Sequence, residues 1–211
     1  MIPSDARAPL CLVGMSGVGK SFWAKRLVDA GWTRHDCDGE IAARLTELVT
    51  PDDGEEPVRA LGRWMGMPWT PGYAEREARY LALEEQVTAR ALEASTDARH
   101  VIDCTGSVVY LSRALQERLA AQTRVVYLQT PPSRVDAMLA RYLAEPKPVV
   151  WGGAYTRERG EDERAALSRS YRELLGGRDA RYRALAHVTL DGAALEASDP
   201  GLVGFLAACG S

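Results

Sequence analysis

The chain has 211 residues, of which 46% are hydrophobic and 26% are charged, and its formal net charge is -3. This length suits one α/β domain spanning residues 1–211, because a single core commonly grows to about 250 residues before it splits. The composition is typical of globular proteins, and basic residues alternate with Asp and Glu, so neither long disordered tracts nor a nucleic-acid-binding surface are indicated.

Short apolar runs rich in β-branched residues alternate with longer amphipathic segments along the chain. This alternation is typical of βαβ units around a parallel sheet. We predict strands at residues 9–13, 32–36, 100–104, 124–129 and 187–190. We predict helices at residues 19–30, 38–48, 73–94, 111–121, 133–144, 162–175 and 201–208.

Two stretches interrupt this alternation. Residues 50–72 contain many Pro and Gly residues and two tryptophans, and residues 145–160 contain two prolines, several glycines and one tryptophan. Loops of this length inside a compact domain are usually functional lids or binding segments, and disorder is the alternative. We therefore expect each stretch to belong to a part of the protein that binds a ligand.

A glycine-rich loop follows the first predicted strand. Residues 14–21 read GMSGVGKS, a full match to the pattern G-x-x-x-x-G-K-[ST]. Glycines let successive backbone N–H groups point inward, and the positive end of the following helix adds to them, so that the loop can hold phosphate oxygens. Lys20 would reach the β and γ phosphates of ATP, and the Ser21 hydroxyl would ligate Mg²⁺. The predicted nucleotide-binding residues of this loop are Gly14, Ser16, Gly17, Val18, Gly19, Lys20 and Ser21.

The alternative for this loop is a chance glycine-rich turn. The context argues against it, because an apolar strand precedes the loop and an amphipathic helix follows it. A GTPase would need an Asn-Lys-x-Asp motif, which the sequence lacks, and an ABC-type signature is missing too. What remains is a small kinase, or else an ATPase or a nucleotide-sensing module.

An acidic pair, Asp36 and Asp38, follows the second predicted strand. Side chains two residues apart in an extended chain point the same way, so both carboxylates would face the end of the sheet where the phosphate loop opens. One would hold Mg²⁺ or its water, and the other would accept the proton of an incoming hydroxyl. The alternative is that Asp38 only caps the helix that follows it.

The phosphate loop followed by the D-x-D-x-x-I string of Asp36, Asp38 and Ile41 resembles the shikimate kinase family. The likeness continues in three further strings, which are VVYLQTPPSRVDAMLARYL from position 125, KP at position 147 and RDARYRALAHVTLD from position 178. The resemblance implies an α/β P-loop NTPase three-layer sandwich with a five-stranded parallel sheet. It also implies a helical acceptor-binding insert at residues 38–94 and a lid at residues 145–175.

The resemblance implies a role for several residues. Lys20 and Ser21 would handle phosphate and Mg²⁺, Asp36 would lie near the metal, and Asp38 would be the base that contacts the acceptor hydroxyl. Arg178 would bind an acceptor carboxylate, a task that suits a planar guanidinium, and the alternative is a solvated arginine at a helix end. Lys147 of the lid would reach the nucleotide.

The sequence also departs from the family at three places. The arginine of the family's F-R-x-x-E pattern is out of register near Tyr73, so Arg76 or Arg79 would bind the acceptor in its place. Of the family's triple-glycine turn only Gly106 remains, as a further acceptor-binding residue. Asp103 ends an apolar strand in the manner of a Walker B carboxylate and would assist at the metal, unless it only caps a turn.

The sequence therefore predicts an ATP-dependent kinase for a hydroxyl of a small molecule, most readily shikimate or a related hydroxy acid. The alternatives are a kinase with another acceptor, such as a sugar acid or a nucleotide, and a non-catalytic ATP-binding module. The four cysteines lie far apart without a CxxC pair, which predicts reduced thiols and a cytoplasmic protein. No signal peptide, membrane span or nucleic-acid partner is expected, and the protein is predicted to be a monomer or a weak homodimer.

Overall fold

The fold is built on a five-stranded sheet, seen in a computed structural model that describes residues 8–45, 55, 57–145 and 147–210. The strands are β1 (Leu10–Val13), β2 (Thr33–Asp36), β3 (His100–Asp103), β4 (Arg124–Gln129) and β5 (Val188–Asp191). Their order across the sheet is β2-β3-β1-β4-β5, and every neighbouring pair is parallel. All five strands lie within one residue of their predicted positions, which confirms the predicted parallel sheet.

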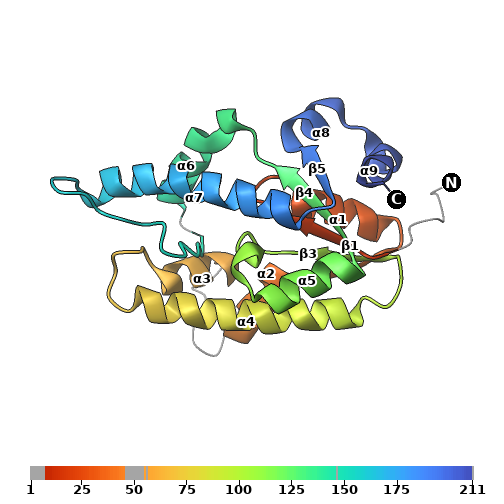
Figure 1. Ribbon diagram of the computed structural model, residues 1–211, viewed down its shortest axis with the longest axis horizontal. Helices are drawn as coiled ribbons and strands as arrows, with labels where there is room; N and C mark the ends of the chain where they lie inside the picture. The colour runs from red at the N-terminus through yellow and green to blue at the C-terminus, as the bar shows by residue number, and fades with distance from the viewer. Residues whose placement is uncertain (1–7, 46–54, 56, 146, 211) are drawn as a thin grey trace.

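Helices cover both faces of this sheet (Figure 1). Alternate strand residues face opposite sides, so Leu10 and Leu12 pack with α1 (Lys20–Asp29) and α9 (Gly201–Cys209) in one core. Cys11 and Val13 belong to the other core, together with residues of α4 (Tyr73–Ala94), α5 (Arg113–Gln122) and α7 (Glu163–Leu185). Because both faces are buried at the centre of the sheet, the central strands β1, β3 and β4 are largely apolar, whereas the edge strands β2 and β5 carry polar residues. The result is the predicted three-layer α/β sandwich.

The remaining helices connect these layers. They are α2 (Cys37–Leu45), α3 (Pro57–Met65), α6 (Val135–Ala144), α8 (Gly192–Ser198) and the short 3₁₀ turns η1 (Val108–Tyr110) and η2 (Pro132–Arg134). The helices α2 and α3 pack against α4 and against each other, which forms the helical insert expected between β2 and β3. Figure 1 shows this group below the sheet, with α6 and α7 above it.

Two sequence-based predictions of local structure were wrong. The helix predicted to end at residue 175 continues through Gly176 and Gly177 to Leu185 as α7. Each glycine costs about 1 kcal/mol in a helix interior, but the buried face continues with Arg178, Tyr182 and Leu185, and the packing of that face outweighs the cost. Within the stretch expected to be a loop, residues 57–65 form α3, whereas residues 46–54 and 56 lie outside the described part of the chain.

The predicted lid combines two kinds of structure. Residues 147–162 contain neither helix nor strand, and the first half of α7 supplies the rest. Val150 and Trp151 are nevertheless buried in the core below α7. Among the described helices none combines the length and apolar character needed to cross a lipid bilayer.

Candidate active site

A cleft of about 870 Å³ opens at the carboxyl ends of the central strands. Parallel α/β sheets bind ligands at this end, where the strand order reverses between β1 and β3. Most of the predicted site residues line this cleft, namely Ser16, Gly17, Val18, Ser21, Asp36, Asp38, Gly106, Lys147 and Arg178. The fold therefore brings together residues from five separate stretches of the sequence.

The phosphate loop has the backbone that its glycines predict. Gly14, Gly17 and Gly19 have φ values of 142°, 80° and 104°, a region that L side chains rarely adopt. A Cβ atom on Gly14 would lie 2.5 Å from the carbonyl oxygen of Leu128. Gly19 precedes α1 and has no side chain with which to cap it, so the first N–H groups of the helix point into the loop.

Lys20 is held inside this loop. Its Nζ donates hydrogen bonds to the carbonyl oxygens of Gly14 at 2.8 Å and Met15 at 3.0 Å. Burial lowers the pKa of Lys20, and the negative charges of Asp103 and Asp38 oppose that effect. The ammonium group of Lys20 therefore lies close enough to both carboxylates to feel their charge.

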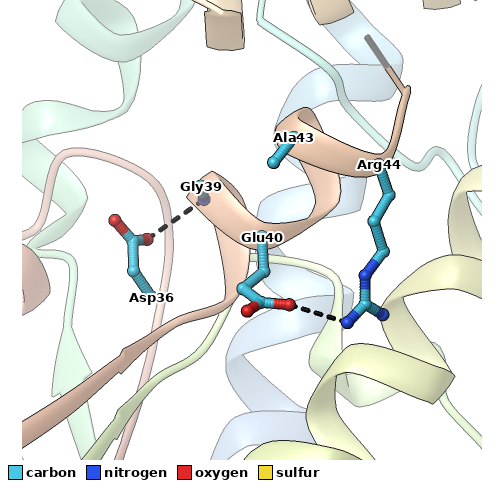
Figure 2. Close-up of a pocket in the computed structure, with 5 residues that line it drawn as sticks. All are labelled: Asp36, Gly39, Glu40, Ala43 and Arg44. Carbon is cyan, nitrogen blue, oxygen red and sulfur yellow. Dashed lines mark hydrogen bonds and ion pairs between the residues drawn. The ribbon is translucent and has the colours of Figure 1, made fainter. Parts of the chain in front are cut away.

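Asp36 and Asp38 lie on different elements. Asp36 ends β2, and its Oδ1 accepts a hydrogen bond from the backbone N–H of Gly39 at 3.2 Å, at the start of α2. Figure 2 shows this bond beside a hollow along the outer side of α2, where Glu40 pairs with Arg44. Asp36 is therefore the residue that caps the helix, which corrects the alternative interpretation of Asp38 as the cap.

Asp38 is left free to face the cleft from the first turn of α2. The side chain is half-buried, and the hydroxyl of Tyr80 lies 3.5 Å from Oδ1, at the limit of a hydrogen bond. Burial raises the pKa of Asp38, and the nearby Lys20 ammonium opposes that rise. A carboxylate with a raised pKa and few partners is suited to accept a proton.

Two of the three predicted oxygen ligands for a magnesium ion lie at adjacent strand ends. Asp36 and Asp103 are paired residues in the register of β2 and β3, and the exposed Ser21 hydroxyl lies on α1. Mg²⁺ prefers such hard oxygen ligands and is usually held by one or two carboxylates together with substrate phosphates. No group of three or more His, Cys, Asp or Glu side chains suited to a metal is found among the described residues. The donor set therefore fits Mg²⁺.

Arg178 lies on α7 and is 3% exposed. Its Nη2 donates to the carbonyl oxygen of Val150 at 2.5 Å, and its guanidinium lies 5.3 Å from the ring centroid of Tyr110. Its Nε has no hydrogen-bond partner among the described residues. A Cβ atom on Gly106 would lie 3.3 Å from Nη1, so only glycine fits here without displacing the guanidinium.

Sequence reasoning missed a buried carboxylate beside this arginine. Glu84 of α4 is fully buried and accepts hydrogen bonds from the hydroxyls of Thr105 and Ser107. Burial raises its pKa to about 7, although the two hydroxyls oppose the rise. The signal was present in the sequence, because Tyr80 and Glu84 have the aromatic-to-Glu spacing of the F-R-x-x-E pattern that we had placed at Tyr73.

Arg76 is not brought to the site. Its guanidinium donates to the backbone carbonyl oxygens of Met65 at 3.0 Å and Pro71 at 3.1 Å, and neither Arg76 nor the exposed Arg79 lines the cleft. Arg76 instead fastens the connection between α3 and α4. Neither of the two predicted substitutes for the family's acceptor-binding arginine therefore lines the cleft as the described residues form it.

Three arginines that line the cleft were not predicted. They are Arg34 of β2, Arg134 of η2 and Arg141 of α6. A Cβ atom on Gly17 would lie 3.5 Å from Nη1 of Arg141, so this guanidinium lies over the phosphate loop. Their sequence context gave no signal, because isolated arginines on predicted helices and strands are usually solvated.

We compared the chain with known protein families, sequences and solved structures. No family model and no curated protein sequence matches the chain. The solved structure of shikimate kinase from Acinetobacter baumannii in complex with shikimate is 22% identical, with a TM-score of 0.56, and covers 88% of this chain and 83% of that chain.

Two further shikimate kinases give a similar result. The enzyme from Bacteroides thetaiotaomicron is 19% identical, with a TM-score of 0.56 over 88% of this chain and 86% of that chain. The enzyme from Aquifex aeolicus is 17% identical, with a TM-score of 0.53 over 87% of this chain and 86% of that chain. At these identities the likeness concerns the fold, so the predicted resemblance is confirmed at that level. The chain has the P-loop fold of the shikimate kinases in a divergent form.

Proposed function

We propose that the protein is an ATP-dependent kinase that phosphorylates a hydroxyl of a small hydroxy acid, shikimate or a relative of it. One observation carries the proposal. The phosphate loop, the carboxylate of Asp38 and the buried guanidinium of Arg178 line the same cleft, which offers a place for a triphosphate, a proton acceptor and an anion-binding group.

The nucleotide would bind at the phosphate loop. The backbone N–H groups of residues 14–21 would hold the phosphate oxygens, and Lys20 would exchange its two carbonyl partners for the β and γ phosphates. Ser21, Asp36 and Asp103 would hold Mg²⁺, which neutralises charge on the transferring phosphoryl group. Lys147 lines the cleft from the lid segment and would add a positive charge at its mouth.

Asp38 would act on the acceptor. It would orient the hydroxyl and take its proton as the oxygen attacks the γ phosphorus and the bond to the β phosphate breaks, with ADP as the leaving group. The half-buried carboxylate lies close enough to Lys20 for each charge to affect the pKa of the other group. Acceptor and phosphoryl group would thus meet between these two side chains.

Arg178 supports an anionic acceptor. A buried guanidinium normally satisfies its five N–H donors, but here one carbonyl oxygen is the strong acceptor and Nε is unpartnered among the described residues. An acceptor carboxylate would supply the missing oxygen atoms in a planar geometry that matches the guanidinium. This favours a hydroxy acid over a neutral sugar.

The proposal is tested by measuring ATP consumption against a panel of hydroxy acids, sugar acids, neutral sugars and nucleotides, with shikimate included. We expect a hydroxy acid to stimulate turnover at least tenfold, and Asp38→Asn to remove that stimulation while ATP affinity changes less than threefold. Asp29→Asn, at the exposed end of α1, is the matched control and should keep full activity. Nucleotide binding without turnover on any acceptor would instead identify a non-catalytic ATP-binding module.

A further inference from the structure

Arg34 bridges the two carboxylates at the ends of β2 and β3. Its Nη2 lies 2.6 Å from Oδ2 of Asp103 and 3.2 Å from Oδ2 of Asp36, and its Nε donates to the same oxygen of Asp103 at 3.2 Å. The arrangement follows from strand geometry. Arg34 and Asp36 are two residues apart and point the same way, and Asp103 is the register partner of Asp36 on the neighbouring strand.

The bridge is largely removed from solvent. The side chain of Asp103 is 4% exposed and that of Arg34 is 18% exposed, whereas that of Asp36 is 43% exposed. A charge pair in such a place is stronger than a surface ion pair, because less water screens it. Arg34 also lines the cleft, so it lies where an entering cation would meet it.

We propose that Arg34 is a positioning residue that acts as a built-in counter-ion: it keeps the magnesium affinity of the acidic pair low until nucleotide phosphates arrive. This inference rests on the proposed kinase function. With Arg34 in place, the pair presents one net negative charge to a cation, where two free carboxylates would present two. The phosphates of a bound nucleotide add the missing negative charge, so metal binding becomes dependent on nucleotide binding.

An ion pair with only a structural role would behave differently. Its loss would lower the free energy of unfolding without changing how the protein binds metal ions. The counter-ion role instead depends on the positive charge of residue 34 and not on its shape. Arg34→Lys keeps the charge, and Arg34→Gln removes it but keeps a hydrogen-bond donor.

The experiment is a titration with Mn²⁺, read by the electron paramagnetic resonance signal of the free ion, with and without ADP. Without ADP we expect Arg34→Gln to bind Mn²⁺ at least about tenfold more tightly than the unaltered protein, since one positive charge within a few ångströms of the metal is removed. The gain in Mn²⁺ affinity on adding ADP should shrink by the same factor. Arg34→Lys should stay within threefold of the unaltered protein.

Arg113→Gln is the matched control, because it removes an arginine paired with Glu117 on the exposed face of α5. It should leave Mn²⁺ binding unchanged. Arg34→Met, whose unbranched stem covers the same part of the sheet edge, is the second charge-removing variant. Each variant is first checked for folding by circular dichroism.

An unchanged or weakened Mn²⁺ affinity in Arg34→Gln and Arg34→Met overturns the proposal, and so does failure of both to fold, because the bridge is then structural. These outcomes are separable from failure of the kinase assignment. If a hydroxy acid still stimulates ATP consumption by the unaltered protein, only the counter-ion role is lost. If the unaltered protein binds no nucleotide, both the counter-ion role and the kinase assignment are wrong.

Discussion

Glu77 of α4 accepts a hydrogen bond from the backbone N–H of Trp151 at 2.5 Å. The same oxygen, Oε1, accepts from the N–H of Gly152 at 3.1 Å and from the hydroxyl of Tyr73 at 2.7 Å. One carboxylate therefore fixes the segment at Trp151 and Gly152 to the helical insert. The carbonyl oxygen of the preceding residue, Val150, accepts a hydrogen bond from Arg178, so the position of the lid segment and the position of the guanidinium are linked.

We predict that Glu77→Ala loosens this segment. Removal of the carboxylate leaves the buried N–H of Trp151 with only the longer contact to the Tyr73 hydroxyl, at 3.3 Å, and frees the exposed N–H of Gly152 to water. A buried N–H group that loses its acceptor costs about 1–3 kcal/mol. Amide hydrogen exchange at Trp151 and Gly152 should accelerate at least tenfold, and ATP hydrolysis in the absence of acceptor should rise as water gains access. Glu75→Ala, on the exposed side of the same helix, is the control and should leave both quantities unchanged.

Glu84 should make the folding stability depend on pH. Its pKa is about 7 in the folded protein because of burial, against an ordinary value of 4.5. Between these values the folded state holds a proton that the unfolded chain has released, so the free energy of unfolding falls as the pH rises through this window. The whole effect is about 3 kcal/mol and is complete near pH 8.

Glu84→Gln cannot titrate and should remove this dependence. Chemical denaturation at pH 5, 6, 7 and 8 should therefore show the variant gaining about 2.5 kcal/mol relative to the unaltered protein from the lowest to the highest pH, since part of the effect is already present at pH 5. The comparison isolates Glu84 from the other charges that face it, chiefly Asp38 and Arg178, since both proteins keep them. For the control Glu93→Gln, which is exposed on the same helix, the free energy of unfolding should vary with pH as it does in the unaltered protein. The same pH dependence in Glu84→Gln would refute the prediction.

Sequence patterns predicted the centre of the sheet well because the strands β1, β3 and β4 are largely buried on both faces. Continuous apolar runs such as Leu10–Val13 and the fixed spacing of the phosphate loop depend on neighbouring residues alone. The helix α4 was likewise predicted at its observed bounds, Tyr73–Ala94. The local sequence was sufficient to predict a strand or helix wherever buried residues recur at regular intervals along the chain.

The parts that were missed depend on residues far apart in sequence. The pairing of Arg34 with Asp103 spans 69 positions, and that of Glu84 with Ser107 spans 23. The glycines in α7 looked like a helix end, because only the tertiary packing of Tyr182 and Leu185 compensates for them. The spacing of Tyr80 and Glu84 marks Glu84 as a candidate, but no argument confined to one segment identifies its partners or those of Arg34.

Gly14 in the phosphate loop and Gly177 inside α7 differ in whether the structure requires glycine, and an alanine substitution at each tests this difference. Gly14→Ala would place Cβ 2.5 Å from the carbonyl oxygen of Leu128 at a φ of 142°, which requires the backbone of the phosphate loop to move. We expect the variant to lose at least about 2 kcal/mol of stability and most of its affinity for nucleotide. Gly177→Ala meets no atom within 4 Å and should gain about 1 kcal/mol, because alanine favours the helix.

Thermal unfolding with and without ATP measures both effects. For a chain of this size, 1 kcal/mol corresponds to about 2–4 °C in the midpoint of unfolding. Gly177→Ala should melt at a higher temperature and keep the full stabilisation by ATP, whereas Gly14→Ala should melt lower and show little of it. Equal ATP stabilisation in the two variants would argue against nucleotide binding at this loop.

Arg178→Lys tests whether the buried guanidinium binds the acceptor. Lysine keeps the charge but loses the planar pair of donors, which is worth about 1.5–3 kcal/mol against a carboxylate, or roughly a 10–100-fold rise in KM for a hydroxy acid. The value of kcat should change less, because the contact is made equally in the ground state and the transition state. Arg181→Lys is the matched control, since its exposed guanidinium also lies over the Tyr110 ring, 4.8 Å from the centroid, and should tolerate the change. A fall in kcat alone would show that Arg178 serves the position of the Val150 segment and not the binding of the acceptor.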